Sequence, residues 1–147
     1  KDSINLIKEL DKDILINFES NKSKVMLNSD SEQLSRVFFN LIKNSIESIL
    51  DKKLNDINLK GNIDISLNDN LNEIYFSVID NGLGFEVLDD NIKNILNPYF
   101  TTKKKGTGLG LAIVNKTIND HNGSIEFIST NKGAKVQIKF LKWIKKF

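Results

Sequence analysis

Cysteine is absent from this 147-residue chain, and proline and tryptophan each occur only once. Without cysteine the chain has neither disulfides nor thiolate metal sites, which is compatible with a cytosolic setting. No apolar run approaches the roughly 18 residues that cross a bilayer, and the first residues show no signal-peptide pattern. The sequence therefore predicts no membrane contact from this segment.

A strong charge of one sign is also missing, because 21 Lys and Arg residues stand against 19 Asp and Glu residues, giving a net charge of +2. This balance does not call for a nucleic-acid partner. Hydrophobic residues make up 39% of the chain and charged residues 27%, which fits one globular domain with its own core. The lysine-rich tail, residues 142–147, fits a strand end with solvated side chains, and the motifs described below leave its role open.

Alternating apolar and polar residues predict several strands, with turn residues between them. The expected strands are residues 14–18, 24–27, 63–67, 73–79, 124–128 and 134–140. The first two are expected to form a hairpin, because the short polar segment 21–23 joins them. Residues 131–133 supply the turn before the last strand.

The clearest helix begins after residues 28–31, whose side chains are typical helix caps. Asn40, Asn44 and Glu47 lie three or four residues apart and therefore share one stripe along this helix. Such asparagines either face solvent or present amide oxygens to a ligand or metal, and the pattern alone leaves both readings open. The apolar face of the same helix consists of Leu34, Val37, Phe38, Leu41, Ile42, Ile46 and Ile49.

Two further helices are expected. One spans residues 109–118, and the turn residues 120–123 terminate it. The other is a short helix at 89–96, which ends before Pro98 because proline disfavours helix at the preceding residue. The weakly patterned stretch from 85 to 105 separates two glycine motifs and is typical of a mobile lid over a site.

A glycine motif directly precedes the helix at 109–118. Gly106, Gly108 and Gly110 stand at alternate positions, and lysines occupy 103–105. Glycine lets the backbone approach a ligand closely, and the first turn of a helix attracts anions. Together these features indicate a polyphosphate cradle, although a glycine-rich turn alone is weak evidence for a nucleotide.

The other glycine motif follows an acidic residue. Asp80 ends a predicted strand, and Gly82 and Gly84 come two and four residues later. An acid at a strand end followed by glycines is well placed to meet a ligand in a crevice. The alternative is a simple tight turn, since Asn-Gly is a common turn dipeptide.

Five motifs occur in one order along the chain: FNLIKNSIE at 39–47, DNGLG at 80–84, NPYFTTK at 97–103, GTGLGL at 106–111 and GA at 133–134. This ordered set resembles the ATP-binding domain of sensor histidine kinases, in the superfamily shared with gyrase, Hsp90 and MutL. The resemblance spans roughly residues 14–141, and the first motif is most similar to nitrogen-regulation-type kinases. It implies an α/β (α+β) fold of the Bergerat type. This is a two-layer sandwich in which helices cover one face of a mixed, mainly antiparallel sheet of about five strands.

The resemblance also assigns roles to individual residues. Asp80 would accept a hydrogen bond from the adenine amine, while Gly82 and Gly84 let the backbone close on the base. Asn44 would offer its amide oxygen to Mg²⁺, and Asn40 would help to shape the same pocket. The phosphates of ATP would bind to the motif formed by Gly106, Thr107, Gly108, Leu109, Gly110 and Leu111, with direct phosphate contacts from Lys43 and Lys103.

The implied activity is that of a protein histidine kinase. Such a domain binds Mg-ATP and donates the γ-phosphoryl group to a histidine on a separate dimerisation domain, upstream of a response regulator. ATP-hydrolysing members of the superfamily place a glutamate four residues before the Mg-binding asparagine, where this chain has Asn40. An amide cannot take a proton from water, so the sequence favours a kinase over a hydrolase. Two alternatives stay open: a nucleotide-binding regulatory module without turnover, and a serine kinase of the anti-sigma type.

The single histidine, His121, comes at the end of a predicted helix, where members of this family often carry a structural histidine. The phosphoacceptor is therefore expected outside this chain. Residues 1–13 are interpreted as a linker remnant from a preceding dimerisation domain, and residues 14–147 as the ATP-binding catalytic domain. We expect a cytoplasmic location, and the sequence leaves open whether the parent protein is anchored in a membrane.

Overall fold

The structure is a computed structural model that describes residues 13–85, 96–99 and 108–142. In this part of the chain, five strands form one sheet in the order β1-β2-β3-β5-β4. The short helix predicted at 89–96 lies, apart from its last residue, outside the described residues. The elements are β1 (Ile14–Ser20), α2 (Ser31–Lys53), β2 (Gly61–Asp69), β3 (Glu73–Asp80), α3 (Gly110–Asp120), β4 (Gly123–Ser129) and β5 (Ala134–Leu141).

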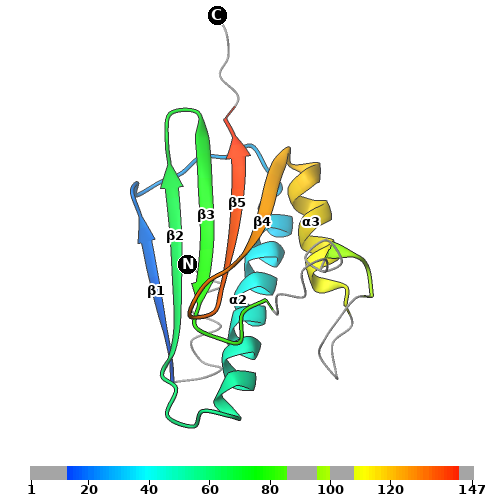
Figure 1. The fold of residues 1–147 in the computed structure, drawn as a ribbon. Coiled ribbons are helices and arrows are strands. Elements are labelled where there is room, and N and C mark those ends of the chain that lie inside the picture. Colours follow the sequence, from blue (N-terminus) through cyan, green and yellow to red (C-terminus); the bar gives the residue numbers. More distant parts are fainter. Residues whose placement is uncertain (1–12, 86–95, 100–107, 143–147) are drawn as a thin grey trace, which may run out of the picture.

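The fold has two layers, with α2 and α3 on the same face of the sheet (Figure 1). Strand β5 shows why this arrangement is stable, because buried and more exposed side chains alternate along it. One face of the sheet therefore packs on the helices while the other faces water. None of the helices in the described ranges is long and apolar enough to span a membrane. The predicted sandwich, with a mixed and mainly antiparallel sheet, is confirmed.

The hairpin predicted for residues 14–18 and 24–27 is wrong. β1 instead pairs in parallel with β2, with Ile16 opposite Ile63, and α2 connects the two strands. Parallel neighbours need a long crossover, which α2 provides. Residues 24–27 form no strand. Val25 and Leu27 are half-buried and pack against the core, so their alternation reflects packing rather than strand pairing.

Both the start and the inner face of α2 follow from the sequence. The Asp30 carboxylate caps the helix by accepting hydrogen bonds from the N–H groups of Glu32 and Gln33, each at 3.0 Å. The predicted apolar face lies on the sheet, where the Phe38 ring contacts that of Phe76 with centroids 4.3 Å apart. This packing fixes α2 over the sheet and brings its later turns beside the end of β3.

His121 joins the end of α3 to the start of α2. Its Nε2 accepts a hydrogen bond from the backbone N–H of Asp30 at 3.0 Å. The proton of the neutral ring is therefore on Nδ1, which donates to the Thr117 carbonyl at 2.8 Å. These contacts agree with the structural role expected for this histidine.

Replacing His121 by alanine removes both of these hydrogen bonds. We expect His121→Ala to lower the free energy of unfolding by about 1–2 kcal/mol, as measured by urea denaturation. The control is Asn119→Ala, at an exposed position of the same helix, which should change that free energy by less than about 0.5 kcal/mol. Equal stability of the two variants would contradict the role assigned to His121.

Candidate functional site

Asp80 is the last residue of β3, and only 6% of it is exposed. Three donors from different parts of the chain hold its carboxylate. Ser45 Oγ on α2 donates to Oδ2 at 2.8 Å, and the N–H groups of Gly82 and Ala134 donate to Oδ1 at 3.0 and 3.4 Å. The acid predicted to meet a ligand is thus fixed by α2, by the loop after β3 and by the start of β5.

The charge state of Asp80 depends on opposing effects. Burial raises the pKa of Asp80 above its ordinary value, because loss of water disfavours the charged carboxylate. The hydrogen bonds from Ser45, Gly82 and Ala134 and the positive charge of Lys52 favour the ionised form and act in the opposite direction. An ionised carboxylate has about four lone-pair sites, so Asp80 can accept a further hydrogen bond beside the three that it already accepts. It is therefore suited to receive an N–H donor from a ligand.

The loop after β3 approaches its neighbours so closely that side chains are excluded. A Cβ on Gly82 would lie 2.4 Å from Ser48 Oγ on α2, and one on Gly133 would lie 2.2 Å from the Asp80 carbonyl oxygen. Gly84 has a left-handed backbone, with φ of 81°. The glycines therefore allow the loop, α2 and the β4–β5 turn to pack directly against one another.

Asn40, Asn44 and Ser48 lie at intervals of four residues on α2 and therefore share one stripe. The stripe reaches the loop after β3 at Ser48, whose Oγ accepts a hydrogen bond from the Leu83 N–H at 3.0 Å. Both asparagine side chains are half-buried, and neither forms a hydrogen bond with another described residue. Their amides thus lie along the helix that borders Asp80, and their binding to a ligand stays a prediction.

The glycine motif before α3 is described only in part, because Lys103, Gly106 and Thr107 lie outside the described residues. Gly108 has a φ of 67°, and α3 begins at Gly110 without a side-chain cap. The first turn of α3 also carries no acidic residue. Its N–H groups and partial positive charge therefore suit an anion, and phosphate binding at this motif stays a prediction.

The other residues predicted to contact phosphate are Leu109, Leu111 and Lys43. Leu109 stands at the start of α3, and Leu111 is half-buried against the core. Lys43 is exposed on α2, with its Nζ 3.8 Å from Glu47 Oε1. A phosphate contact by Lys43 therefore stays a prediction.

The chain matches, over residues 29–143, the family described as Histidine kinase-, DNA gyrase B-, and HSP90-like ATPase. The matched segment contains Asp80, the asparagines of α2 and the glycine motifs. The chain belongs to this family. The resemblance inferred from the five ordered motifs is thereby confirmed.

Of three curated proteins similar to this ATPase-family domain, two are named as kinases and the third as a nitrogen regulation protein. Sporulation kinase A of Bacillus subtilis is 35% identical over 130 residues, which are 88% of this chain and 20% of that protein. Sensor histidine kinase ZraS of Escherichia coli O157:H7 is 32% identical over 134 residues, 90% of this chain and 26% of that protein. Nitrogen regulation protein NtrY of Azorhizobium caulinodans is 36% identical over 110 residues, 75% of this chain and 14% of that protein. The chain thus spans about a quarter or less of these relatives.

Solved structures agree with this assignment. A nucleotide-free form of the catalytic domain of histidine kinase ThkA has a TM-score of 0.81 and 27% sequence identity. The similarity covers 96% of this chain and 88% of the ThkA chain. The ATPase-family domain therefore has the architecture of a histidine kinase catalytic domain.

Sequence reasoning missed several groups that surround Asp80 in this ATPase-family domain. Ser45 and Ser48 lie three residues apart on α2, so one face of the helix presents two small hydroxyls to the β3 loop. That spacing was a usable signal next to the asparagine stripe. Lys52 and the Ala134 N–H gave no signal of their own, because their contacts join residues far apart in the chain.

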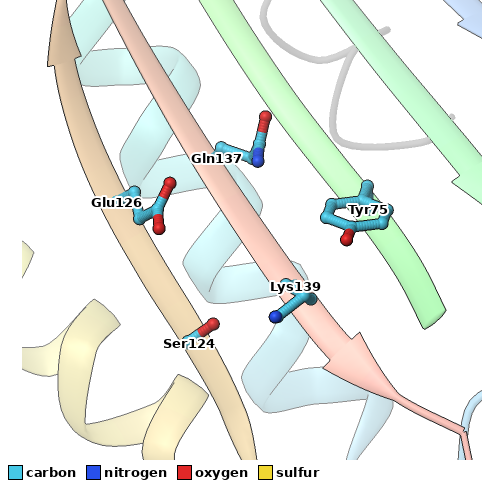
Figure 2. A pocket seen from close by; sticks show the side chains of 5 residues that line it. All are labelled: Tyr75, Ser124, Glu126, Gln137 and Lys139. Atoms are coloured by element: carbon cyan, nitrogen blue, oxygen red, sulfur yellow. The ribbon is translucent and has the colours of Figure 1, made fainter.

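Two hollows in the described part of the ATPase-family domain lie away from Asp80. The larger, of about 570 Å³, lies beside Asp69 and His121. Asp69 is the last residue of β2, whereas Asp80 lies beside the start of that strand. The other opens on the sheet face that turns away from the helices (Figure 2). The side chains that line it come from β3, β4 and β5. Neither contains a residue predicted to bind nucleotide. The second hollow, of about 140 Å³, is lined by Tyr75, Ser124, Glu126, Gln137 and Lys139.

Proposed function

We propose that this domain binds Mg-ATP and donates its γ-phosphoryl group to a histidine on a separate domain of a parent sensor histidine kinase. The observation that carries the proposal is the buried Asp80 carboxylate, which accepts hydrogen bonds from three donors. Beside it, Gly82 and Gly133 pack so closely on their neighbours that a side chain would not fit. In this proposal Asp80 accepts the exocyclic amine of adenine. Guanine is rejected because it presents a carbonyl at the corresponding position.

Asn44 is the proposed protein ligand of Mg²⁺. Within the described ranges, no group of three or more His, Cys, Asp or Glu side chains is arranged to hold a metal ion. A magnesium ion here would take most ligands from nucleotide phosphates and water, which is its usual preference. The half-buried Asn44 amide fits the one protein oxygen that such an arrangement needs, and Asn40, one turn earlier, shapes the same pocket.

Phosphate binding is assigned to the glycine motif and the first turn of α3. Backbone N–H groups there would hold the phosphates, and Lys43 and Lys103 would neutralise further charge. No residue of the domain needs to become covalently modified. Its contribution is to position the nucleotide and to stabilise the charge of the transferring group.

A kinase is favoured over a hydrolase by the residue at position 40. Asn40 stands one turn before Asn44 on α2, where a water-activating glutamate would be needed for hydrolysis. Glu47 lies on the other side of Asn44 and pairs with Lys43. It is therefore poorly suited to act as the missing base.

The parent protein is proposed to be a two-component sensor kinase that acts on a response regulator. The kinase names of two relatives support this view. The small share of the length of all three relatives that this chain spans also supports it. Residues 1–13 would then lead from the dimerisation domain, and residues 14–147 would form the catalytic domain. A cytoplasmic location would give this domain access to ATP and to the regulator.

The role of Asn44 is tested by calorimetric titration with a non-hydrolysable ATP analogue, with and without Mg²⁺. We expect Asn44→Ala to weaken binding about tenfold in the presence of Mg²⁺ and to change it little in its absence. The control is Asn58→Ala, at an exposed position between α2 and β2, which should bind like the unchanged domain. An equal loss with and without Mg²⁺ would argue against a metal ligand.

Phosphoryl transfer is tested by adding the domain, with Mg-ATP, to a histidine-bearing dimerisation domain supplied in trans. The expected product is acid-labile phosphohistidine on that domain and none on the isolated chain. Nucleotide binding without transfer to any supplied histidine domain would instead favour the regulatory-module alternative.

A further inference from the structure

Lys52 stands in the last turn of α2 and forms no salt bridge with a carboxylate of the described residues. Its Nζ donates instead to three backbone carbonyl oxygens, those of Asn81, Gly82 and Lys132, each at 2.9 Å. A lysine ammonium has three donors, so all of them are used. Lys52 therefore ties α2 to the loop after β3 and to the β4–β5 turn at once.

The segments that Lys52 joins are those that hold the Asp80 carboxylate. Gly82 donates its N–H to Asp80 Oδ1, and so does Ala134, two residues after the third carbonyl. Gly133, between Lys132 and Ala134, packs directly on the Asp80 carbonyl. The position of Asp80 Oδ1 is therefore set by two segments that are held together at a single ammonium group.

We propose that Lys52 is a positioning residue for base recognition, because it locks the two donors to Asp80 Oδ1 in place and so aims the carboxylate at the adenine amine. This inference rests on the function proposed above. Lys52 acts through Asp80 and does not itself contact the nucleotide. Its charge also favours the ionised carboxylate, which is the form that accepts hydrogen bonds at both oxygens.

The first test needs no nucleotide. Amide hydrogen exchange at Gly82 and Ala134 is compared between the unchanged domain, Lys52→Met and the neighbouring control Lys53→Met. Methionine keeps an unbranched apolar stem but has no donors. We expect exchange at these two amides to become about tenfold faster in Lys52→Met and to stay unchanged in Lys53→Met. The Ile65 amide in β2 should be unaffected in both variants.

The second test measures selectivity for the base. Affinities for ADP and for purine riboside diphosphate, which lacks the exocyclic amine, are measured by calorimetry. We expect the preference for ADP to fall by roughly tenfold in Lys52→Met and to persist in Lys53→Met. A merely destabilised domain would bind both ligands less well and keep their ratio.

The two tests separate this inference from the proposed function. Unchanged exchange at Gly82 and Ala134, or an unchanged preference for ADP in Lys52→Met, would overturn the role of Lys52. If the unchanged domain bound neither ligand, the proposed function would fail. The positioning role in base recognition would fail with it, even if faster exchange showed that Lys52 holds the loop.

Discussion

Asp80→Asn is expected to lower the affinity for ADP by about 100-fold while leaving the domain folded. Asparagine has the shape of aspartate, so its oxygen still accepts the N–H groups of Gly82 and Ala134, and its amide can donate to Ser45 Oγ. The adenine amine, however, would meet an N–H₂ group where it now finds a carboxylate oxygen. The loss of one charged acceptor and the burial of an unpaired donor together account for the expected size.

The measurement is calorimetric titration with ADP beside a urea unfolding curve for each protein. The control is Glu126→Gln, which makes the same charge change at an exposed position on the outer face of the sheet. It should bind ADP as the unchanged domain does. ADP binding by Asp80→Asn at normal affinity would exclude Asp80 as the base-recognising group.

The raised pKa of Asp80 also predicts how stability and binding depend on pH. Because the pKa is higher in the folded state, the folded state retains its proton over a range where the unfolded chain releases it. The contribution of Asp80 to stability is therefore complete below its ordinary pKa of 3.8 and is lost as pH rises through the folded-state pKa. ADP affinity should rise over the same range, because ionised Asp80 is the better acceptor. Both trends should be absent from Asp80→Asn in parallel unfolding and binding series.

Gly133→Ala is expected to lower the free energy of unfolding by about 3 kcal/mol. The new Cβ would lie 2.2 Å from the Asp80 carbonyl oxygen and 2.9 Å from Asn81 Cα. Both atoms belong to the backbone, so no side-chain rotation relieves the overlap and β5 must move away from the end of β3. That movement also withdraws the Ala134 N–H from Asp80, so ADP binding should be lost together with stability.

Gly110→Ala is the matched control, because no atom of the described residues lies within 4 Å of a Cβ at this position. Gly110 begins α3, where alanine reduces the freedom of the unfolded chain and should raise the free energy of unfolding by about 0.5–1 kcal/mol. The comparison uses urea denaturation without nucleotide. Similar stabilities for the two alanine variants would show that the contact between β5 and β3 is looser than the structure indicates.

Helices were predicted better than strand partners, and the reason is physical. The apolar face of α2 repeats within a few residues, and its cap at Asp30 bonds to residues two and three positions later. Such signals are complete within one segment of sequence. The partner of β1 is not, since Val25 and Leu27 alternate like a strand but only pack on the core, while β1 pairs across α2 with β2.

The sequence by itself determined the family, the α2 and α3 helices, the acid at Asp80 and the glycines that follow it. Motif order and local periodicity are properties of the sequence and need no knowledge of contacts between distant residues. Only the tertiary structure decided what surrounds the Asp80 carboxylate. Ser45 and Ala134 lie 35 and 54 residues from it in sequence. Their contacts exist only once α2 and β5 have packed against β3, since burial and not local pattern brings these donors to one carboxylate.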